Sequence, residues 1–539
     1  PFNGYVFEGF ITVKRNEAIQ QIGYRHLTKE LTEGVENFFA DMGGEPDYDP
    51  KHLNCESFDS NETFALYCEG GHCFYVANKK KTDETPLKEI TDLEWPAFNK
   101  AIEKEVNAMV KKNKALTPLT LARSQEVRQT MPERILPPRF ALRRKPVDPE
   151  DNVDERLRIK REWFHPDGRG GEEYKAKCRW IIVGFHDPDI LELEVSAPAP
   201  QLQTVNLFLS VSASMREEIF IGDMEEAFQQ GKRITRLLFA DQPKDVVLPD
   251  MVPGQIYQLE VEVYGTVRGS ANWRETAVEE TAKLGYKQAK LDACLFYLPP
   301  RDFSRKQLIE DLQSPFEEDE WLVPRKRHKP TQKLYIPNEG RLILLTDDVA
   351  DSGNERHRSL MEKLQERFRF GKYRSIRNAE GGTFNGRKLW QYDDYSVKSS
   401  MQEYIEKRVQ QIPLSKERAK HLNDAVTEEE RASLRSAGMV QHWCARNVHY
   451  EALGGTSILS RQFNNATVQT IIDANKIAKH MRENKALGLI FKPIDPAEVV
   501  GGVSCDGSLP EKGEVTSTGG LLVFFTTRNL KAGEEAPVN

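Results

Sequence analysis

Three aspartates stand where short apolar runs end. Asp223 closely follows the run 219–221, and Asp347 with Asp348 directly follow Leu342–Leu345. Carboxylates presented from the ends of neighbouring strands can hold two divalent ions about 4 Å apart. One ion lowers the pKa of an attacking hydroxyl and the other neutralises a departing pyrophosphate, and oxygen ligands shared with substrate phosphates favour Mg²⁺. The pattern therefore indicates two-metal phosphoryl transfer.

Each part of this pattern also has an ordinary structural interpretation. An Asp-Asp pair after an apolar run is more often a simple turn, because Asp favours turns, and Asp223 alone is an equally weak signal. A separate cluster, Cys68, His72 and Cys73, could suggest zinc. A structural zinc site needs four ligands and the fourth is not evident, so the Gly-Gly between two β-rich arms favours a hairpin there.

The helices expected around the aspartates follow from apolar residues spaced three and four apart. Trp95, Phe98 and Ile102 begin one such stripe, which predicts a helix that extends through Asn113. Further helices are expected over about 202–216 and 272–284, after Asp348, and through the C-terminal third to about residue 488.

The strands are predicted from short β-rich runs bounded by turn residues. Residues 139–185 are expected to form a β-hairpin with an elaborated tip, and residues 293–298 a further strand. Residues 333–336 and 341–346 are expected to pair as a second hairpin that leads into Asp347. The chain turns β-like again from Val499.

Composition narrows the class of protein. At roughly 150 residues per domain, 539 residues predict three or four folded units, and 39% hydrophobic with 29% charged residues fits a globular chain. The net charge of −7 argues against binding nucleic acid by bulk charge alone. No apolar window is long enough to span a membrane, and no secretory signal opens the chain. Seven scattered Cys fit a reducing intracellular compartment, and the start at Pro1 suggests a fragment.

Several motifs, in one order, resemble the reverse transcriptase region of copia-type LTR retrotransposon polyproteins. Each is a landmark of that region and matches part of its pattern. They are the helix 95–113, YKAKCRWIIVGF at 174–185, GDMEEAFQQG at 222–231, YG through W at 264–273, LGY with DACLF at 284–296, LTDDVA at 345–350, SILSR at 457–461 and TSTG through F at 516–525. The resemblance covers roughly residues 90–530.

The resemblance implies an α+β fold: a right-hand polymerase with fingers, palm and thumb, followed by a truncated ribonuclease H-like segment. The implied domains are an upstream region of unknown role (1–90), fingers and palm (91–410, with an insertion at 300–332), a helical thumb and connection (411–495) and an incomplete ribonuclease H-like segment (496–539). It implies RNA-directed DNA synthesis with two Mg²⁺ ions, which Mn²⁺ can replace.

The resemblance also implies site residues. Asp223, Asp347 and Asp348 become the catalytic, metal-binding carboxylates, and Phe228 falls on the aromatic gate that excludes the ribose 2′-hydroxyl. Phe228 could instead be a core residue, because an aromatic at the start of a helix is usually buried.

Further substrate-binding residues follow from the same resemblance. Lys177 and Arg179 fall where fingers residues meet the incoming triphosphate, with solvated strand charges as the alternative. Lys372 is a candidate proton donor to pyrophosphate. Arg268 occupies the family's Gln beside the templating base pair, and this departure puts activity or fidelity in doubt, as does Thr346 before the aspartate pair.

The implied partners are an RNA template, a DNA primer, the RNA–DNA hybrid and deoxynucleoside triphosphates, with no membrane. The implied location is intracellular, in cytoplasmic virus-like particles and the nucleus. Two other hypotheses remain open: a catalytically inactive relic or host-adopted nucleic-acid-binding protein, and an unrelated two-metal nuclease. The three surviving carboxylates favour the enzyme.

The ribonuclease H-like segment is expected to be inactive. Asp506 resembles the first carboxylate of its catalytic strand, and two-metal cleavage needs several more acidic ligands. No Asp follows Asp506, and the later acids, Glu511, Glu514, Glu534 and Glu535, lie in loop-like or terminal stretches.

Overall fold

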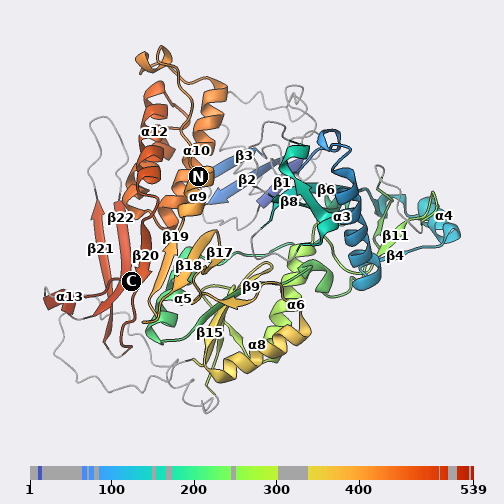
Figure 1. Ribbon diagram of the computed structural model, residues 1–539, viewed down its shortest axis with the longest axis horizontal. Helices are drawn as coiled ribbons and strands as arrows, with labels where there is room; N and C mark the ends of the chain where they lie inside the picture. The colour runs from blue at the N-terminus through green and yellow to red at the C-terminus, as the bar shows by residue number, and fades with distance from the viewer. Residues whose placement is uncertain are drawn as a thin grey trace, which may run out of the picture. The chain divides into compact units, whose positions relative to one another are not determined.

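The computed structural model describes the chain in segments (Figure 1). The described residues are 10–14, 63–69, 72–77, 84–147, 153–164, 173–243, 251–300, 338–496, 498–507, 519–527, 529–532 and 536–539. The chain divides into two compact units. Unit 1 contains Pro1–Ala197 and Ala227–Ala277, and unit 2 contains Pro198–Glu226 and Val278–Asn539. Each unit is therefore assembled from segments that are distant in sequence.

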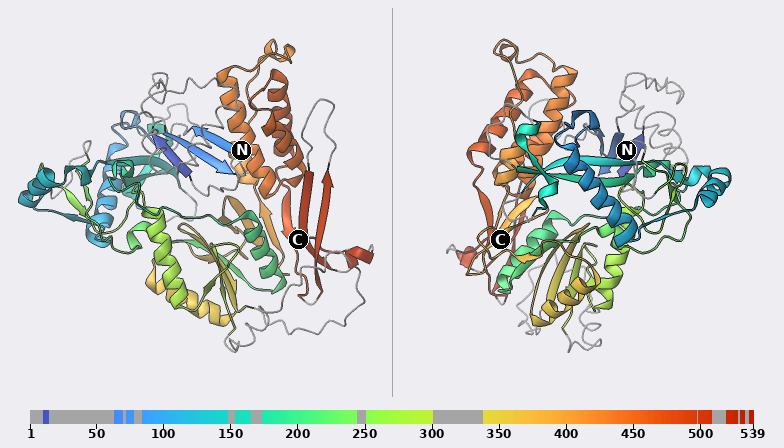
Figure 2. Two further views of the ribbon diagram at one scale, coloured as in Figure 1. Left: turned by 180° about the vertical axis from the view of Figure 1, so that it is seen from behind. Right: turned by 45° about the vertical axis from the view of Figure 1, so that its right-hand side comes forward.

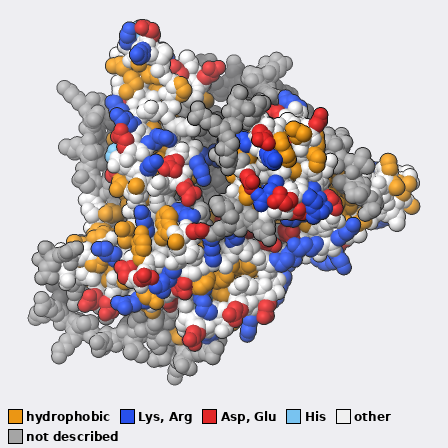
Figure 3. Space-filling view, in the orientation of Figure 1, with side chains coloured by type: hydrophobic (Ala, Val, Ile, Leu, Met, Phe, Trp, Pro, Cys, Tyr) orange, Lys and Arg blue, Asp and Glu red, His pale blue; other side chains and the backbone are white. Residues whose placement is uncertain are grey.

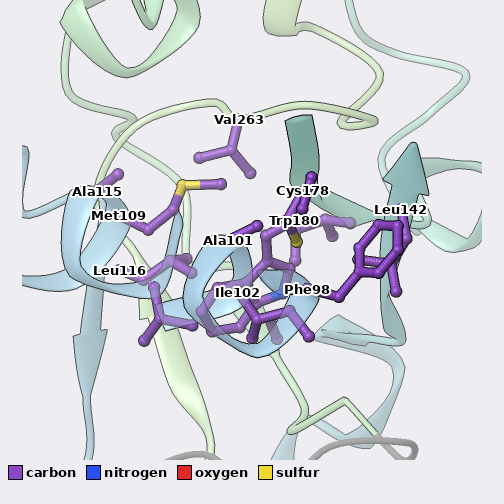
Figure 4. Close-up of a cluster of buried hydrophobic side chains, with 14 of the residues drawn as sticks. Phe98, Ala101, Ile102, Met109, Ala115, Leu116, Leu142, Cys178, Trp180 and Val263 are labelled. Atoms are coloured by element: carbon purple, nitrogen blue, oxygen red, sulfur yellow. The ribbon is translucent and has the colours of Figure 1, made fainter. Parts of the chain in front are cut away.

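Unit 1 is organised around a helix packed on a three-stranded sheet. Helix α3 (Trp95–Asn107) continues into a π-helical turn, Ala108–Lys112. The sheet has the order β6 (Pro138–Pro146), β8 (Glu173–Ile182), β7 (Arg158–Lys160). Figure 4 shows the buried cluster that α3 and this sheet share, with Phe98 and Ile102 from the helix and Trp180 from β8. The predicted helix and hairpin are both confirmed, and β7 lies in the elaborated part of the hairpin.

Two further sheets belong to unit 1. The first has the order β4 (Leu116–Pro118), β11 (Tyr257–Leu259), β10 (Phe239–Ala240), β5 (Ile135–Leu136), with α4 (Leu121–Thr130) following β4. The second has the order β1 (Phe10–Lys14), β2 (Thr63–Glu69), β3 (His72–Ala77). The backbone of Cys68 lies opposite that of Cys73 in the antiparallel pair β2 and β3, which confirms that the two β-rich arms form a hairpin.

Unit 2 is built on a six-stranded antiparallel sheet. Its order is β12 (Lys287–Gln288), β13 (Leu295–Leu298), β14 (Gly340–Leu345), β15 (Asp348–Gly353), β9 (Ile219–Asp223), β16 (Arg374–Ser375). Helix α5 (Leu202–Ser214) covers one face, where Phe208 packs with Ile221 and Ala350. Helix α8 (Glu355–Arg367) covers the other, where His357 contacts Asp351. Helix α6 (Gly269–Lys283) runs along the chain from unit 1 into unit 2.

The expected second hairpin needs a correction. Residues 333–336 lie outside the described part of the chain, as do residues 301–332 of the expected insertion. The other arm is β14, whose two neighbours are β13 and β15. The turn that follows β14 therefore closes the hairpin with β15, and Asp347 and Asp348 stand at this turn rather than beyond a finished hairpin.

The remainder of unit 2 combines a second sheet with helices (Figure 2). The sheet has the order β17 (Gly382–Phe384), β18 (Arg387–Gln391), β19 (Val397–Ser400), β20 (Gly488–Phe491). The helices are α9 (Gln402–Arg408), α10 (Glu428–Asn447), α11 (Leu453–Arg461) and α12 (Val468–Glu483). Helices α10 and α12 lie side by side, and Cys444 of one packs in the same buried cluster as Ala478 of the other.

The chain ends in a two-stranded antiparallel sheet, β21 (Val499–Gly507) with β22 (Gly519–Thr527), and a short helix, α13 (Asn529–Ala532). Helices α9–α12 and the strands after Val499 confirm part of the prediction. Residues 382–400, which belong to the stretch expected to be helical, form strands β17–β19 instead, because they pair with one another and with β20.

The distribution of charged side chains on the surface and the apolar content of the helices can be compared with the expectations from composition. On the face shown in Figure 3, basic and acidic side chains are interspersed, in keeping with a net charge of −7. Among the helices in the described segments, none is both long and apolar enough to cross a bilayer.

Candidate active site

The register between two central strands brings the aspartates together. Strand β15 runs antiparallel to β9, and Asp348 lies directly opposite Asp223. Side chains directly opposite each other in an antiparallel pair share a face of the sheet. Ile219 and Ile221 precede Asp223 on that face and belong to the buried cluster under α5, so the apolar row ends in a carboxylate where the sheet ends.

A two-residue turn places Asp347 beside this pair. Leu345 and Asp348 are paired in register, and Thr346 and Asp347 form the turn between them. Thr346 has a φ of 55°, in the left-handed region that non-glycine residues seldom adopt. The carbonyl of Asp347 accepts a hydrogen bond of 2.7 Å from the backbone N–H of Met224. This bond ties the turn to the residue that follows Asp223.

A third segment holds the Asp223 carboxylate in place. The backbone N–H of Lys372 donates to Asp223 Oδ1 at 3.0 Å, and the N–H of Gly371 donates to the Asp223 carbonyl at 2.8 Å. A Cβ at Gly371 would lie 2.7 Å from Asp223 Oδ2, and one at Gly222 would lie 2.9 Å from the Lys372 carbonyl. Both glycines are therefore needed for the approach of this segment to β9.

The three aspartates influence one another electrostatically. Burial, together with the charges of Asp347 and Asp223, raises the pKa of Asp348 to about 6. Mutual repulsion among close carboxylates is relieved by a bound cation, so this cluster has the electrostatics of a cation site.

The three aspartates supply only part of the oxygen ligands that a Mg²⁺ ion needs. In the described part of the chain, no three His, Cys, Asp or Glu side chains form a ready-made metal site. Mg²⁺ is usually held by one or two carboxylates together with substrate phosphates, and it keeps several waters. Asp223, Asp347 and Asp348 therefore fit an ion whose coordination is completed by a polyphosphate substrate.

A buried polar network anchors β15 on the opposite face of the sheet. Asp351 Oδ1 lies 2.9 Å from His357 Nε2 and accepts from Arg358 at 2.5 Å, while Tyr373 donates its hydroxyl to Oδ2 at 2.9 Å. His357 Nδ1 in turn lies 2.7 Å from the Tyr286 hydroxyl. Burial lowers the pKa of His357. The sequence did not single out this network, because its members are scattered along the chain.

Unit 1 contains the basic residues predicted from the resemblance. Lys177 and Arg179 lie on β8, and Lys177 pairs with Arg143 of β6 in the sheet. Burial lowers the pKa of Lys177 to about 8, and the neighbouring charges of Arg179 and Lys145 act in the same direction. The guanidinium carbon of Arg179 lies 5.0 Å from the centre of the Tyr264 ring. The two predicted residues therefore share a basic face of the hairpin.

The remaining predicted residues have clear locations. Phe228 lies in the 3-10 helix Ala227–Gln230, is half-buried, and has its ring centre 5.0 Å from that of Tyr264. Arg268 binds Glu275 at 2.5 Å and the Glu194 carbonyl at 3.3 Å, so its guanidinium is held by unit 1 itself. Lys372 is exposed.

Asp506 lies apart from these residues along the chain. It belongs to β21, where its backbone pairs with Gly520 of β22. Its role in a ribonuclease H-like site stays a prediction.

Sequence reasoning missed Gly371 and Asp351, and it quoted Tyr264 only as a motif letter. A glycine after an aromatic-rich, basic stretch carries no signal by itself. Gly371 is important because its segment approaches Asp223 in space, although the two residues are more than a hundred positions apart in the sequence.

The comparisons agree with part of this description. The family model described as reverse transcriptase (RNA-dependent DNA polymerase) matches residues 150–312. The match spans Lys177, Arg179, Asp223, Phe228 and Arg268 and ends before Asp347. It covers less than half of the chain and supports a reverse transcriptase region there. The search of curated proteins gave no match.

Proposed function

We propose that this chain is an RNA-directed DNA polymerase of a copia-type retrotransposon, which extends a DNA primer on an RNA template. The observation that carries the proposal is the direct pairing of Asp348 with Asp223, with Asp347 in the adjoining turn. The match of residues 150–312 to a reverse transcriptase family also supports it; that match includes Asp223 and ends before the aspartate pair.

The parts of the proposed polymerase are assigned to elements of the two units. The sheet that carries Asp223 and Asp348 is the palm, the β6–β8 hairpin with α3 belongs to the fingers, and helices α9–α12 form the thumb and connection. The β21–β22 hairpin is the start of a ribonuclease H-like segment.

The chain's own residues supply positioning and selection. Asp223, Asp347 and Asp348 would hold two Mg²⁺ ions, which lower the pKa of the primer 3′-hydroxyl and neutralise charge on the departing pyrophosphate. The Lys372 N–H orients the Asp223 carboxylate, and the Lys372 side chain is the proposed proton donor to pyrophosphate.

The proposed nucleotide contacts come from unit 1. Lys177 and Arg179 bind the triphosphate, for which a basic hairpin face is suited. Phe228 excludes the 2′-hydroxyl by its volume, because a partly exposed aromatic ring can form one wall of a nucleotide pocket.

Primer extension on an RNA template with Mg²⁺ tests the proposal. Asp223→Asn and Asp347→Asn should each abolish DNA synthesis, because the amide cannot replace a charged metal ligand. Template–primer affinity should stay near the parental value, since binding is carried by basic residues and backbone phosphates. Asp393→Asn, at a fully exposed side chain, is the matched control and should extend primers normally.

The outcomes separate the polymerase from the alternatives. Full synthesis by Asp347→Asn would refute the assignment of the carboxylates. Template–primer binding without synthesis by the parental chain would instead favour a catalytically inactive relic or a host-adopted nucleic-acid-binding protein.

A further inference from the structure

Tyr264 lies between two side chains that are proposed to contact the nucleotide. Its ring centre is 5.0 Å from that of Phe228, with the planes inclined at 57°, and 5.0 Å from the guanidinium carbon of Arg179. All three side chains are partly exposed and belong to unit 1. One aromatic ring thus contacts the proposed sugar gate on one side and a proposed triphosphate ligand on another.

The backbone around Tyr264 is fixed by a close crossing of two segments. The Ile182 N–H donates to the Tyr264 carbonyl at 2.9 Å, and the Gly184 N–H donates to the Gly265 carbonyl at 3.1 Å. A Cβ at Gly184 would lie 2.3 Å from the Gly265 carbonyl oxygen, and one at Gly265, where φ is 88°, would lie 2.2 Å from the Ile182 carbonyl oxygen. Only glycines permit this crossing, which joins the end of β8 to the loop that presents Tyr264.

A hydroxyl closes the same loop. Thr266 Oγ1 donates to the Val263 carbonyl at 2.6 Å and accepts from the Val263 N–H at 3.1 Å. The residues on both sides of Tyr264 are therefore held by short-range hydrogen bonds. With its backbone fixed at both ends, the Tyr264 ring can act as a support for the Phe228 and Arg179 side chains beside it.

We propose that Tyr264 is a positioning residue that couples sugar selection at Phe228 to triphosphate binding at Arg179. The inference rests on the proposed function. An aromatic face attracts a guanidinium and limits its freedom, and a tilted aromatic pair restricts the rotation of the Phe228 ring. Both effects come from the ring of Tyr264, so a variant without the ring loses both, and one that lacks only the hydroxyl keeps both.

Single-nucleotide incorporation by Tyr264→Leu and Tyr264→Phe tests this inference. Tyr264→Leu should raise the KM for the deoxynucleotide and raise the ratio of ribonucleotide to deoxyribonucleotide kcat/KM, each by about threefold or more, which is the scale of one lost aromatic or cation–π contact. Tyr264→Phe should restore both quantities. Thermal unfolding should show that both variants are folded.

Two further variants show where the effect arises. Tyr174→Leu removes another aromatic pair on β8, the contact with Phe164 at 5.3 Å, and should leave the sugar ratio unchanged. Combined with Phe228→Val, Tyr264→Leu should add little to the ratio, because both substitutions act through the same ring.

The results distinguish this inference from the function on which it rests. An unchanged sugar ratio and KM in folded Tyr264→Leu, or equal defects in Tyr264→Leu and Tyr264→Phe, would overturn the inference alone. Fully additive effects with Phe228→Val would overturn the proposed route through Phe228. Absence of DNA synthesis by the parental chain would overturn the proposed function together with the inference.

Discussion

Replacing Asp348 by Asn should stabilise the protein while abolishing its proposed activity. The pKa of Asp348 is raised from an ordinary value of 3.8 to about 6 by burial and by the charges of Asp347 and Asp223. The folded state therefore disfavours the ionised carboxylate. Asn removes the charge, keeps the shape and relieves the repulsion.

The magnitude follows from linkage. A rise of the pKa from 3.8 to about 6, at roughly 1.36 kcal/mol per pKa unit, gives an upper bound of about 3 kcal/mol. Partial solvent screening of the side chain reduces this to about 1–2 kcal/mol, or a rise of about 2–8 °C in the unfolding temperature of a unit of this size. Because the folded pKa is raised, the destabilisation is complete above pH 6, about half present at pH 5 and absent below the unfolded value.

Calorimetric unfolding of the parental chain and Asp348→Asn between pH 5 and pH 8, in the presence of a chelator, measures the effect. The variant should unfold at a higher temperature at pH 7.5, and the difference should shrink toward pH 5. Added Mg²⁺ or Mn²⁺ should stabilise the parental chain more than the variant, since binding to the folded state alone raises stability. Asp393→Asn should change neither curve.

Two results would refute this reasoning. A variant that is less stable than the parental chain at pH 7.5 would mean that Asp348 makes a favourable contact rather than suffering repulsion. A stabilisation that does not depend on pH would mean that it arises from something other than the lost charge.

Three other predictions follow from the same contacts. Gly371→Ala should reduce DNA synthesis about a hundredfold or more, since its Cβ would displace the Asp223 carboxylate, with template–primer affinity unchanged; Gly454→Ala, which meets no atom within 4 Å, should keep the parental rate. The KM for deoxynucleotide should rise between pH 7 and pH 9, because Lys177, with a pKa of about 8, loses its charge there; Lys177→Arg should flatten this profile, and an equally steep profile would assign it elsewhere. Asp351→Leu should lower the free energy of unfolding by about 3–5 kcal/mol in chemical denaturation, because it leaves a partly buried arginine unpaired; a loss under 1 kcal/mol would show that the network adds little.

Local patterns in the sequence predicted most of the elements that carry the site. The apolar run before Asp223 and the run before Asp347 each predict a strand, because a short continuous apolar run of β-rich residues is a local property of the sequence. The helix beginning at Trp95 and the β6–β8 hairpin were likewise found. These are elements whose own residues decide their form.

Long-range pairing could not be predicted in the same way. The neighbours of β14 were misjudged, because which strand pairs with which depends on the whole sheet. The sheet β17–β20 is not predicted from the sequence, since strands such as Val397–Ser400 bury Ser399 and Ser400 as well as Val397 and so lack a clear apolar run. The importance of Gly371 and Tyr264 likewise depends on what approaches them in space.

The alternation along β15 has a consequence for how faithfully the sheet assembles. Asp348 and Ala350 face α5, whereas Asp351 faces α8 and is fully satisfied there. A slip of one residue against β9 would exchange these faces: it would place Asp351 among the apolar side chains under α5, without its partners, and would turn Asp348 away from the face of Asp223. Asp351 therefore disfavours the shifted register of β15 during folding. In this way it helps to fix the position of the aspartate pair at the end of the sheet without itself approaching the nucleotide.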